Sequence, residues 1–104
     1  MPKVLEKAKE LRRLWGGFQS ARVLLTANNF KVFEYLKSRK TADEVSEILE
    51  TDERATERLL DALTGLGLLK KAAKGYKNAT LSNLFLISES PYYQGDIIKH
   101  ADNL

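Results

Sequence analysis

Apolar residues recur at spacings of three and four at the start of the chain, the period of one face of an α-helix. The positions are Val4, Leu5, Ala8, Leu11, Leu14 and Trp15. The pattern predicts an amphipathic helix over residues 1–17 with a basic outer face, and we expect Gly16 and Gly17 to break or hinge it. Such a helix can pack on its own domain or against a second subunit. Packing on a membrane surface fits less well, because the polar face also carries Glu6 and Glu10.

Residues 18–37 predict a second, longer helix that is apolar over most of its circumference. Its apolar positions are Phe18, Ala21, Val23, Leu24, Leu25, Ala27, Phe30, Val32, Phe33, Tyr35 and Leu36. A single core-facing stripe covers only about 100° of a helix, so this helix requires burial on more than one side. We expect a partner subunit to cover the second side. The alternative is that the N-terminal helix alone covers it.

Two short helices are predicted next. Thr41 and Glu44 have the spacing of a capping box, and Thr51 or Asp52 is expected to cap the following helix. The second of these helices is expected to end in a left-handed residue at Gly65 or Gly67.

A hairpin follows these helices, with strands predicted at residues 68–72 and 76–79 and a turn at Lys74-Gly75. Two helices and a hairpin in this order are typical of a winged helix-turn-helix. Thr80 is expected to cap a short helix, and Ser90 to cap a last helix beginning at Pro91. The apolar face of that last helix is predicted to contain Ile97, Ile98, Ala101 and Leu104.

The predicted fold is therefore mainly α: a winged helix-turn-helix with a small β-hairpin wing and extra N-terminal helices that serve dimerisation. We divide the chain into an N-terminal amphipathic dimer arm at 1–17, a winged-helix dimerisation domain at 18–90, and the start of a linker helix at 91–104. Its 104 residues are enough for one such domain.

Charge is distributed unevenly and argues against the usual task of a winged helix. The net charge is +3, but residues 1–40 contribute +7, residues 41–64 contribute −6 and residues 65–104 contribute +2. The predicted recognition helix would therefore bring net negative charge to a polyanion, which costs Coulomb energy. A small DNA-binding transcription regulator remains the alternative function, because the wing itself is basic.

No catalytic, cofactor or metal site is predicted. The chain has one histidine, His100, and no cysteine, and nothing in the sequence orients that histidine as a base. Gly65 and Gly67 follow a helix, the reverse of a dinucleotide-binding turn. No apolar run is long enough to span a membrane and no signal peptide is recognisable, so we expect a cytoplasmic protein.

Four stretches resemble the N-terminal dimerisation domain of S-adenosylmethionine-dependent O-methyltransferases. They are NNFKVFEYL, KTADEVSEIL, ATERLLDALTGLGLLKK and GYKNATLSNLFLISESPYYQGDIIKH, the last being the most specific. In that family a Rossmann-like domain follows and holds the cofactor and the catalytic histidine, so no catalytic residue is carried over to this chain. The resemblance implies an intertwined homodimer that helps to close the pocket for a small-molecule methyl acceptor.

Two groups of residues are candidates for these roles. The predicted dimer interface consists of Leu5, Leu11, Leu14, Trp15, Phe18 and Leu25. The candidates for substrate-pocket or lid contacts are Phe18, Phe30, Tyr92 and Tyr93. We expect the chain alone to be inactive and not to bind S-adenosylmethionine.

Overall fold

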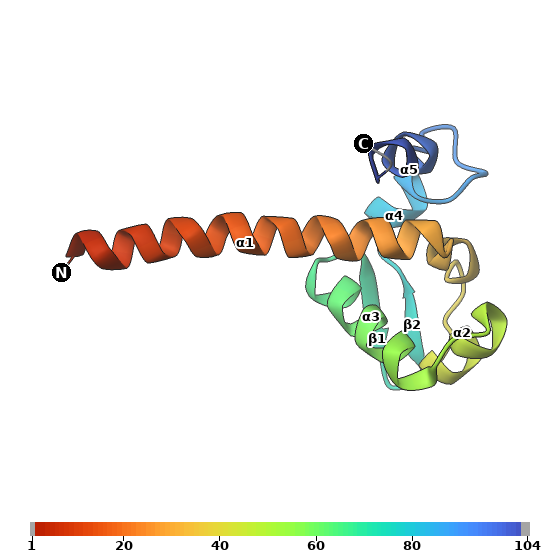
Figure 1. The fold of residues 1–104 in the computed structure, drawn as a ribbon. Helices are drawn as coiled ribbons and strands as arrows, with labels where there is room; N and C mark the ends of the chain where they lie inside the picture. The colour runs from red at the N-terminus through yellow and green to blue at the C-terminus, as the bar shows by residue number, and fades with distance from the viewer. Residues whose placement is uncertain (1, 103–104) are drawn as a thin grey trace.

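A long N-terminal helix carries a small winged-helix body at its C-terminal end (Figure 1). The computed structural model describes residues 2–102, without the side chains of Pro2, Trp15, Ala101 and Asp102. The expected places of Ala101 and Leu104 on the last helix therefore lie outside what is described. The elements are α1 (Pro2–Asn29), the 3₁₀ helix η1 (Val32–Tyr35), α2 (Ala42–Leu49), α3 (Glu53–Gly65), β1 (Leu69–Ala72), β2 (Gly75–Asn78), α4 (Thr80–Phe85) and α5 (Gly95–Asp102).

The expected break at Gly16 and Gly17 is wrong, because α1 runs without interruption through both residues. Neither glycine has a heavy atom within 4 Å of where a Cβ would lie, so nothing crowds the backbone into a bend. The Ser20 hydroxyl donates to the Gly16 carbonyl at 3.0 Å within the continuous helix. A glycine in a helix costs about 1 kcal/mol relative to alanine, which the many other hydrogen bonds of a 28-residue helix can absorb.

The expected helix over residues 18–37 is also wrong in its second half. α1 ends at Asn29, and Lys31 takes the left-handed conformation with φ 57°. The chain turns there into η1, where Val32, Phe33 and the following Leu36 are almost completely buried. The turn directs these three side chains into the body of the domain, whereas a straight continuation of α1 would carry them past it.

Caps define the helix-turn-helix as predicted. The Thr41 hydroxyl accepts from the Glu44 backbone at 3.1 Å while the Glu44 carboxylate accepts from the Thr41 backbone at 2.9 Å, which completes the capping box. Of the two candidates for the next cap, Asp52 is the residue used, through a 2.8 Å bond from the Ala55 N–H. Gly67, with φ +81°, is the left-handed residue after α3.

The wing is an antiparallel pair in which Leu69 lies opposite Asn78 and Ala72 opposite Gly75. A bridge between Lys40 and Tyr76 adds a short third segment, with backbone bonds of 2.9 and 2.7 Å. Gly75 has φ +118°, and a Cβ there would lie 2.2 Å from the Lys40 carbonyl oxygen, so this close approach requires glycine. The predicted winged helix-turn-helix is confirmed.

The C-terminal segment differs from the prediction at both of its helix starts. Ala79, not Thr80, is the N-cap of α4, and it makes no side-chain hydrogen bond. The last helix begins at Gly95, not Pro91: Ser90 to Gln94 form a turn whose last N–H donates to the Phe85 carbonyl at 2.7 Å. The buried Asn28 side chain of α1 donates to the Gly95 carbonyl at 2.9 Å and thereby fixes where α5 starts.

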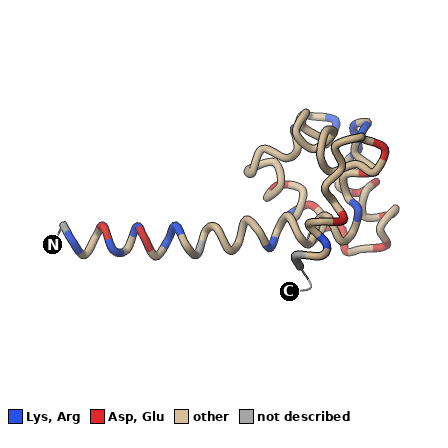
Figure 2. Tube along the Cα trace, turned by 90° about the horizontal axis from the view of Figure 1, so that it is seen from above, with Lys and Arg blue, Asp and Glu red and all other residues tan. Residues whose placement is uncertain are grey.

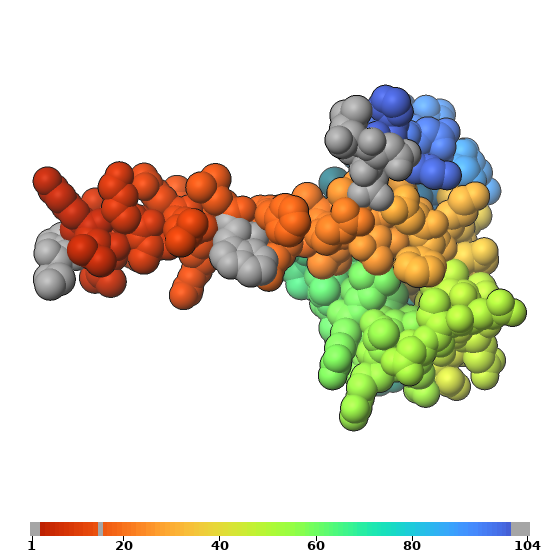
Figure 3. Space-filling model, viewed as in Figure 1, coloured from red at the N-terminus to blue at the C-terminus, as the bar shows by residue number. Residues whose placement is uncertain are grey.

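The core lies where η1, α2, α3 and the hairpin meet beneath the C-terminal half of α1. Its most enclosed side chains are Val32, Phe33, Leu36, Val45, Leu60 and Leu63. Because half of α1 extends beyond this core, the radius of gyration is 15.5 Å. A compact domain of this length has a radius of gyration of about 13 Å. Figure 3 shows the free half of α1 as an arm without contacts on its visible side.

Candidate interaction surface

The free half of α1 exposes large apolar side chains that no other described part of the protomer covers. Every described side chain from Lys3 to Gln19 is exposed. Among them Leu5, Leu11, Leu14 and Phe18 keep 65–75% of their surface in contact with solvent. Exposed apolar surface this extensive marks an interaction site.

α1 has two apolar faces on opposite sides of the helix. In the C-terminal half, Val23, Leu24 and Ala27 pack against the domain core. A second set, Val4, Leu11, Phe18 and Leu25, repeats every seven residues along the whole helix. At 100° per residue this set lies about 180° from the core-facing residues. We call this set, together with Leu14, the α1 stripe.

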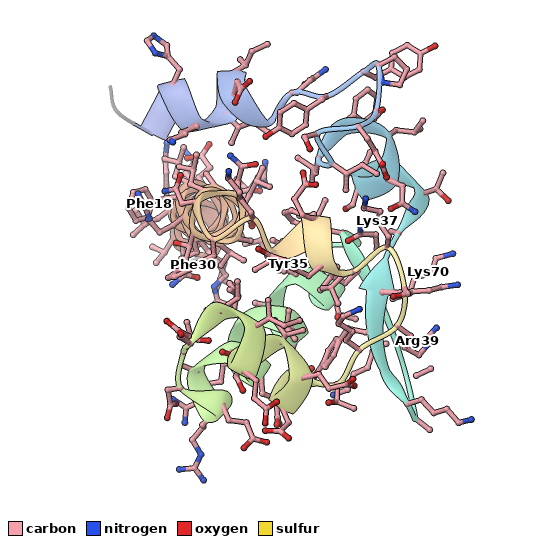
Figure 4. The ribbon with its side chains drawn as sticks, turned by 90° about the vertical axis from the view of Figure 1, so that its right-hand side faces the viewer. Phe18, Phe30, Tyr35, Lys37, Arg39 and Lys70 are labelled. Carbon is pink, nitrogen blue, oxygen red and sulfur yellow. The ribbon has the colours of Figure 1, made fainter. Side chains whose placement is uncertain are left out.

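A strict seven-residue repeat is the pattern of a helix that pairs with another helix. The stripe is exposed at Val4, Leu11, Leu14 and Phe18 and partly buried at Leu25, where the body begins. In the view along α1, Phe18 lies on the side of the helix away from Lys37, Arg39 and Lys70, whereas Phe30 lies on the side that faces α2 and α3 (Figure 4). The stripe therefore faces open solvent, with α5 on one flank and α3 on the other.

Five of the six residues predicted for the dimer interface can be placed. Leu11, Leu14, Phe18 and Leu25 belong to the stripe, and Leu5 lies on its flank. The side chain of Trp15 lies outside the described residues. The heptad spacing that includes Val4 was readable in the sequence, but the expected break at Gly16 and Gly17 divided it between two helices.

Sequence reasoning missed an apolar groove beside α1. It has a volume of about 180 Å³ and is lined by Thr26, Phe30, Leu49, Thr51, Ala55, Thr56 and Leu59, from α1, the turn after it, α2 and α3. Phe30, one of the predicted pocket residues, is 47% exposed at its edge. We call this site the α2–α3 groove.

The other two pocket candidates lie in the turn before α5. Tyr92 is 62% exposed, whereas Tyr93 is half-buried and covers Gly95 so closely that a Cβ there would meet its hydroxyl at 2.2 Å. Burial, followed by the charges of Asp96 and Glu34, raises the pKa of Tyr93. Phe30 therefore belongs to the α2–α3 groove, whereas Tyr92 and Tyr93 belong to a different segment. A substrate contact stays a prediction for these three residues and for Phe18.

The exposed side of α3 carries charge of both signs with an acidic excess. Glu53, Arg54, Glu57, Arg58 and Asp61 are all exposed. Asp61 is engaged by the wing, because Tyr76 and Lys71 both donate to its Oδ1 atom, at 2.6 and 2.9 Å. The recognition helix is therefore joined to the wing and does not present a basic face.

Two kinds of feature are absent from the described part of the chain. No helix in residues 2–102 is long and apolar enough to cross a membrane. Among the same residues, no group of three or more His, Asp and Glu side chains could hold a metal ion. His100 is an exposed residue of α5.

Residues 12–88 match the family model of the O-methyltransferase dimerisation domain. The chain belongs to this family. A human protein described as a probable bifunctional dTTP/UTP pyrophosphatase/methyltransferase is 37% identical over 97 residues, which cover 90% of this chain and 16% of that protein. The S-adenosyl-L-methionine-dependent methyl transferase PigF of Serratia is 31% identical over 99 residues, covering 94% of this chain and 28% of PigF.

Solved structures agree with the sequence relatives. Human N-acetylserotonin methyltransferase, in complex with SAM, superposes with a TM-score of 0.85 at 28% identity, over 92% of this chain and 30% of that one. The chain thus spans less than a third of each of these proteins. The predicted resemblance to the dimerisation domain of S-adenosylmethionine-dependent O-methyltransferases is confirmed, and so is the fold.

No glycine-rich cofactor turn lies among the described residues. Such a turn follows a parallel strand and opens a helix. In residues 2–102 the sheet consists of two antiparallel strands, Gly65 is the last residue of α3, and Gly67 lies between α3 and β1. The most prominent feature of the described surface is the exposed α1 stripe.

Proposed function

We propose that this chain is the N-terminal part of an S-adenosylmethionine-dependent O-methyltransferase and forms a homodimer through α1. The observation that carries the proposal is the α1 stripe, a continuous seven-residue apolar repeat on a face that the protomer leaves open. Homodimers usually have two-fold symmetry and use the same patch on both subunits, which one self-complementary stripe can provide. An obligate interface of this type buries about 2,000 Å² or more in total.

The proposal gives each part of the parent enzyme a separate role. Residues 1–17 act as the dimer arm, residues 18–90 as the winged-helix dimerisation domain, and residues 91–104 as the start of the link to a catalytic domain. That domain holds the cofactor and a small-molecule methyl acceptor in the cytoplasm, while this one closes the acceptor pocket. Calorimetry should find no heat of binding when S-adenosylmethionine is titrated into the 104-residue chain, and a measurable affinity would contradict this division.

Sedimentation velocity tests the dimer. The unmodified chain should sediment as a dimer at micromolar concentration, and Leu11→Asp should convert it to a monomer because a carboxylate would be buried without a partner. Arg13→Asp is the matched control: it introduces the same side chain on the opposite side of the same helical turn and should leave the dimer intact. If the unmodified chain sediments as a monomer at micromolar concentration, the proposal is wrong.

Transcription regulation is the rival function. The wing offers Lys70, Lys74 and Lys77 to a phosphate backbone, but the helix that would enter the groove carries an acidic excess. A gel shift on duplex DNA at several salt concentrations separates the two. A regulator should bind with a steep negative salt dependence, whereas a dimerisation domain should not bind.

A further inference from the structure

We propose that the tip of the arm of one copy fills the α2–α3 groove of the other copy. The inference rests on the proposed homodimer and deepens it, because it assigns the register of the two chains and a second contact outside the α1 stripe.

Register follows from complete use of the stripe. If two α1 helices run antiparallel with their midpoint between residues 14 and 15, Val4 lies opposite the partner's Leu25, and Leu11 opposite the partner's Phe18. A shift by one heptad in either direction leaves stripe residues without a counterpart. In this register the tip of each arm ends beside the partner's Leu25, next to Thr26 and Phe30 at the edge of the groove.

Symmetry decides on which flank of the partner the tip lies. A two-fold axis perpendicular to an antiparallel pair keeps each flank of the stripe on the same side in both copies. Ala8 and Thr26 are 18 residues apart, which is five whole turns at about 3.6 residues per turn, so both point to the same flank. Leu5 lies on that flank too, at the height of the tip. The apolar Leu5 and Ala8 of one copy are thus brought against the groove of the other.

The groove suits such an occupant. It is lined by Phe30, Leu49, Ala55 and Leu59 with three threonines between them, and it contains no charged side chain. Leu5 is 66% exposed in the protomer and Phe30 is 47% exposed. Both therefore gain burial from the same contact.

Charge complementarity distinguishes this arrangement from a parallel pair. Residues 1–22 carry six Lys or Arg and two Glu, net +4, and the charges are concentrated in the outer half of α1 (Figure 2). Parallel pairing would place two such arms side by side. Antiparallel pairing places each arm along residues 41–64 of the partner, which are net −6. Arg12 lies on the same flank as Leu5 and Ala8, one to two turns farther from the tip.

Positive charges at two places oppose the contact. Arg58 is exposed beside Leu59 on α3, and the register sets Lys7 opposite the partner's Arg22. Both lie at the exposed surface, where water screens like charges and a single contact between them weakens the interface little. The net charges of the two regions outweigh them.

Chemical cross-linking of introduced cysteines tests the contact. The chain itself contains no cysteine, so only the introduced residues can react. The variant Leu5→Cys/Ala55→Cys is treated with a short bismaleimide. Within one chain the two positions cannot be joined, since Leu5 lies about 30 Å along α1 from Thr26 in the groove. Any 5–55 link is therefore between copies and appears as a covalent dimer. The pair Ala8→Cys/Ala55→Cys provides a second geometry, and Leu5→Cys/Lys74→Cys, on the wing, is the matched control.

We expect at least one of the two groove pairs to form a covalent dimer about tenfold faster than the wing control. It should also exceed the variants that carry only one of the cysteines. The reason is that proximity raises the effective concentration of the reacting groups. Sedimentation of the same samples separates the possible failures. A dimer in which neither groove pair exceeds the control overturns this inference and leaves the homodimer standing. A monomer overturns both.

Discussion

The hydroxyl of Tyr76 donates a 2.6 Å hydrogen bond to the carboxylate of Asp61, and this contact joins the wing to α3. The Lys71 ammonium donates to the same carboxylate oxygen at 2.9 Å and lies 5.2 Å from the centre of the Tyr76 ring. The Tyr76 bond first, and the Lys71 bond second, lower the pKa of Asp61. Burial and the same bond raise the pKa of Tyr76. The acidic face of α3 thus stabilises the hairpin.

Tyr76→Phe should lower the free energy of unfolding by about 1 kcal/mol at neutral pH, since it removes a hydrogen bond to a half-exposed carboxylate. A carboxyl whose pKa is lowered by folding stabilises above its ordinary value, near 3.9, and loses that effect as the pH falls through the lowered value. The difference between variant and parent should therefore shrink in acid. Urea unfolding at a series of pH values measures it. Tyr92→Phe, which alters an exposed tyrosine, is the control and should change nothing.

Thr41→Ala should cost about 1 kcal/mol, because it removes the side-chain half of the capping box at the start of α2. The Thr41 backbone and side-chain bonds lower the pKa of Glu44, so the contribution of this box is also lost as the pH falls through that lowered value. Thr80→Ala is the matched control, because Thr80 follows the N-cap of α4 and Ala79 occupies the cap itself. Urea midpoints that fall equally for both variants would contradict the assignment of the caps.

Local chemistry made the winged helix predictable, because a capping box, an aspartate cap, a left-handed glycine and a glycine turn each act over a few residues. The errors arose where tertiary packing decides. The end of α1 depends on the burial of Phe33 and Leu36, and the start of α5 depends on Asn28, which is 67 residues distant from Gly95. The α2–α3 groove combines residues from 26–30, 49–51 and 55–59, so no single stretch of the sequence predicts it. The α1 stripe was present in the sequence but was divided at a glycine pair that does not bend the helix.

Gly16→Ala and Gly17→Ala should each stabilise the arm by about 0.5–1 kcal/mol, because alanine loses less backbone entropy than glycine in a helix and both sites have room for a methyl group. The helical signal in circular dichroism should rise and the thermal midpoint should increase. Neither position lies on the α1 stripe, so the sedimentation coefficient should stay unchanged. A loss of helix in either variant would show that the glycine pair serves as a hinge after all.

Lys77→Glu should stabilise the wing. Lys70 and Lys77 lie directly opposite each other in the hairpin, and both are exposed. Like charges at facing positions are destabilising, and an opposite-charge pair contributes about 0.2–1 kcal/mol. The bridge between Lys40 and Tyr76 also sets Arg39 beside Lys77, so the new carboxylate would have a cation on each side.

Lys74→Glu makes the same charge change in the turn, where no facing lysine exists in the strand register. The free energy of unfolding in urea should increase for Lys77→Glu only, and the gain should diminish at high salt because the pair is exposed. Equal effects of the two variants at low salt would mean that overall charge, and not the facing pair, sets the stability of the wing.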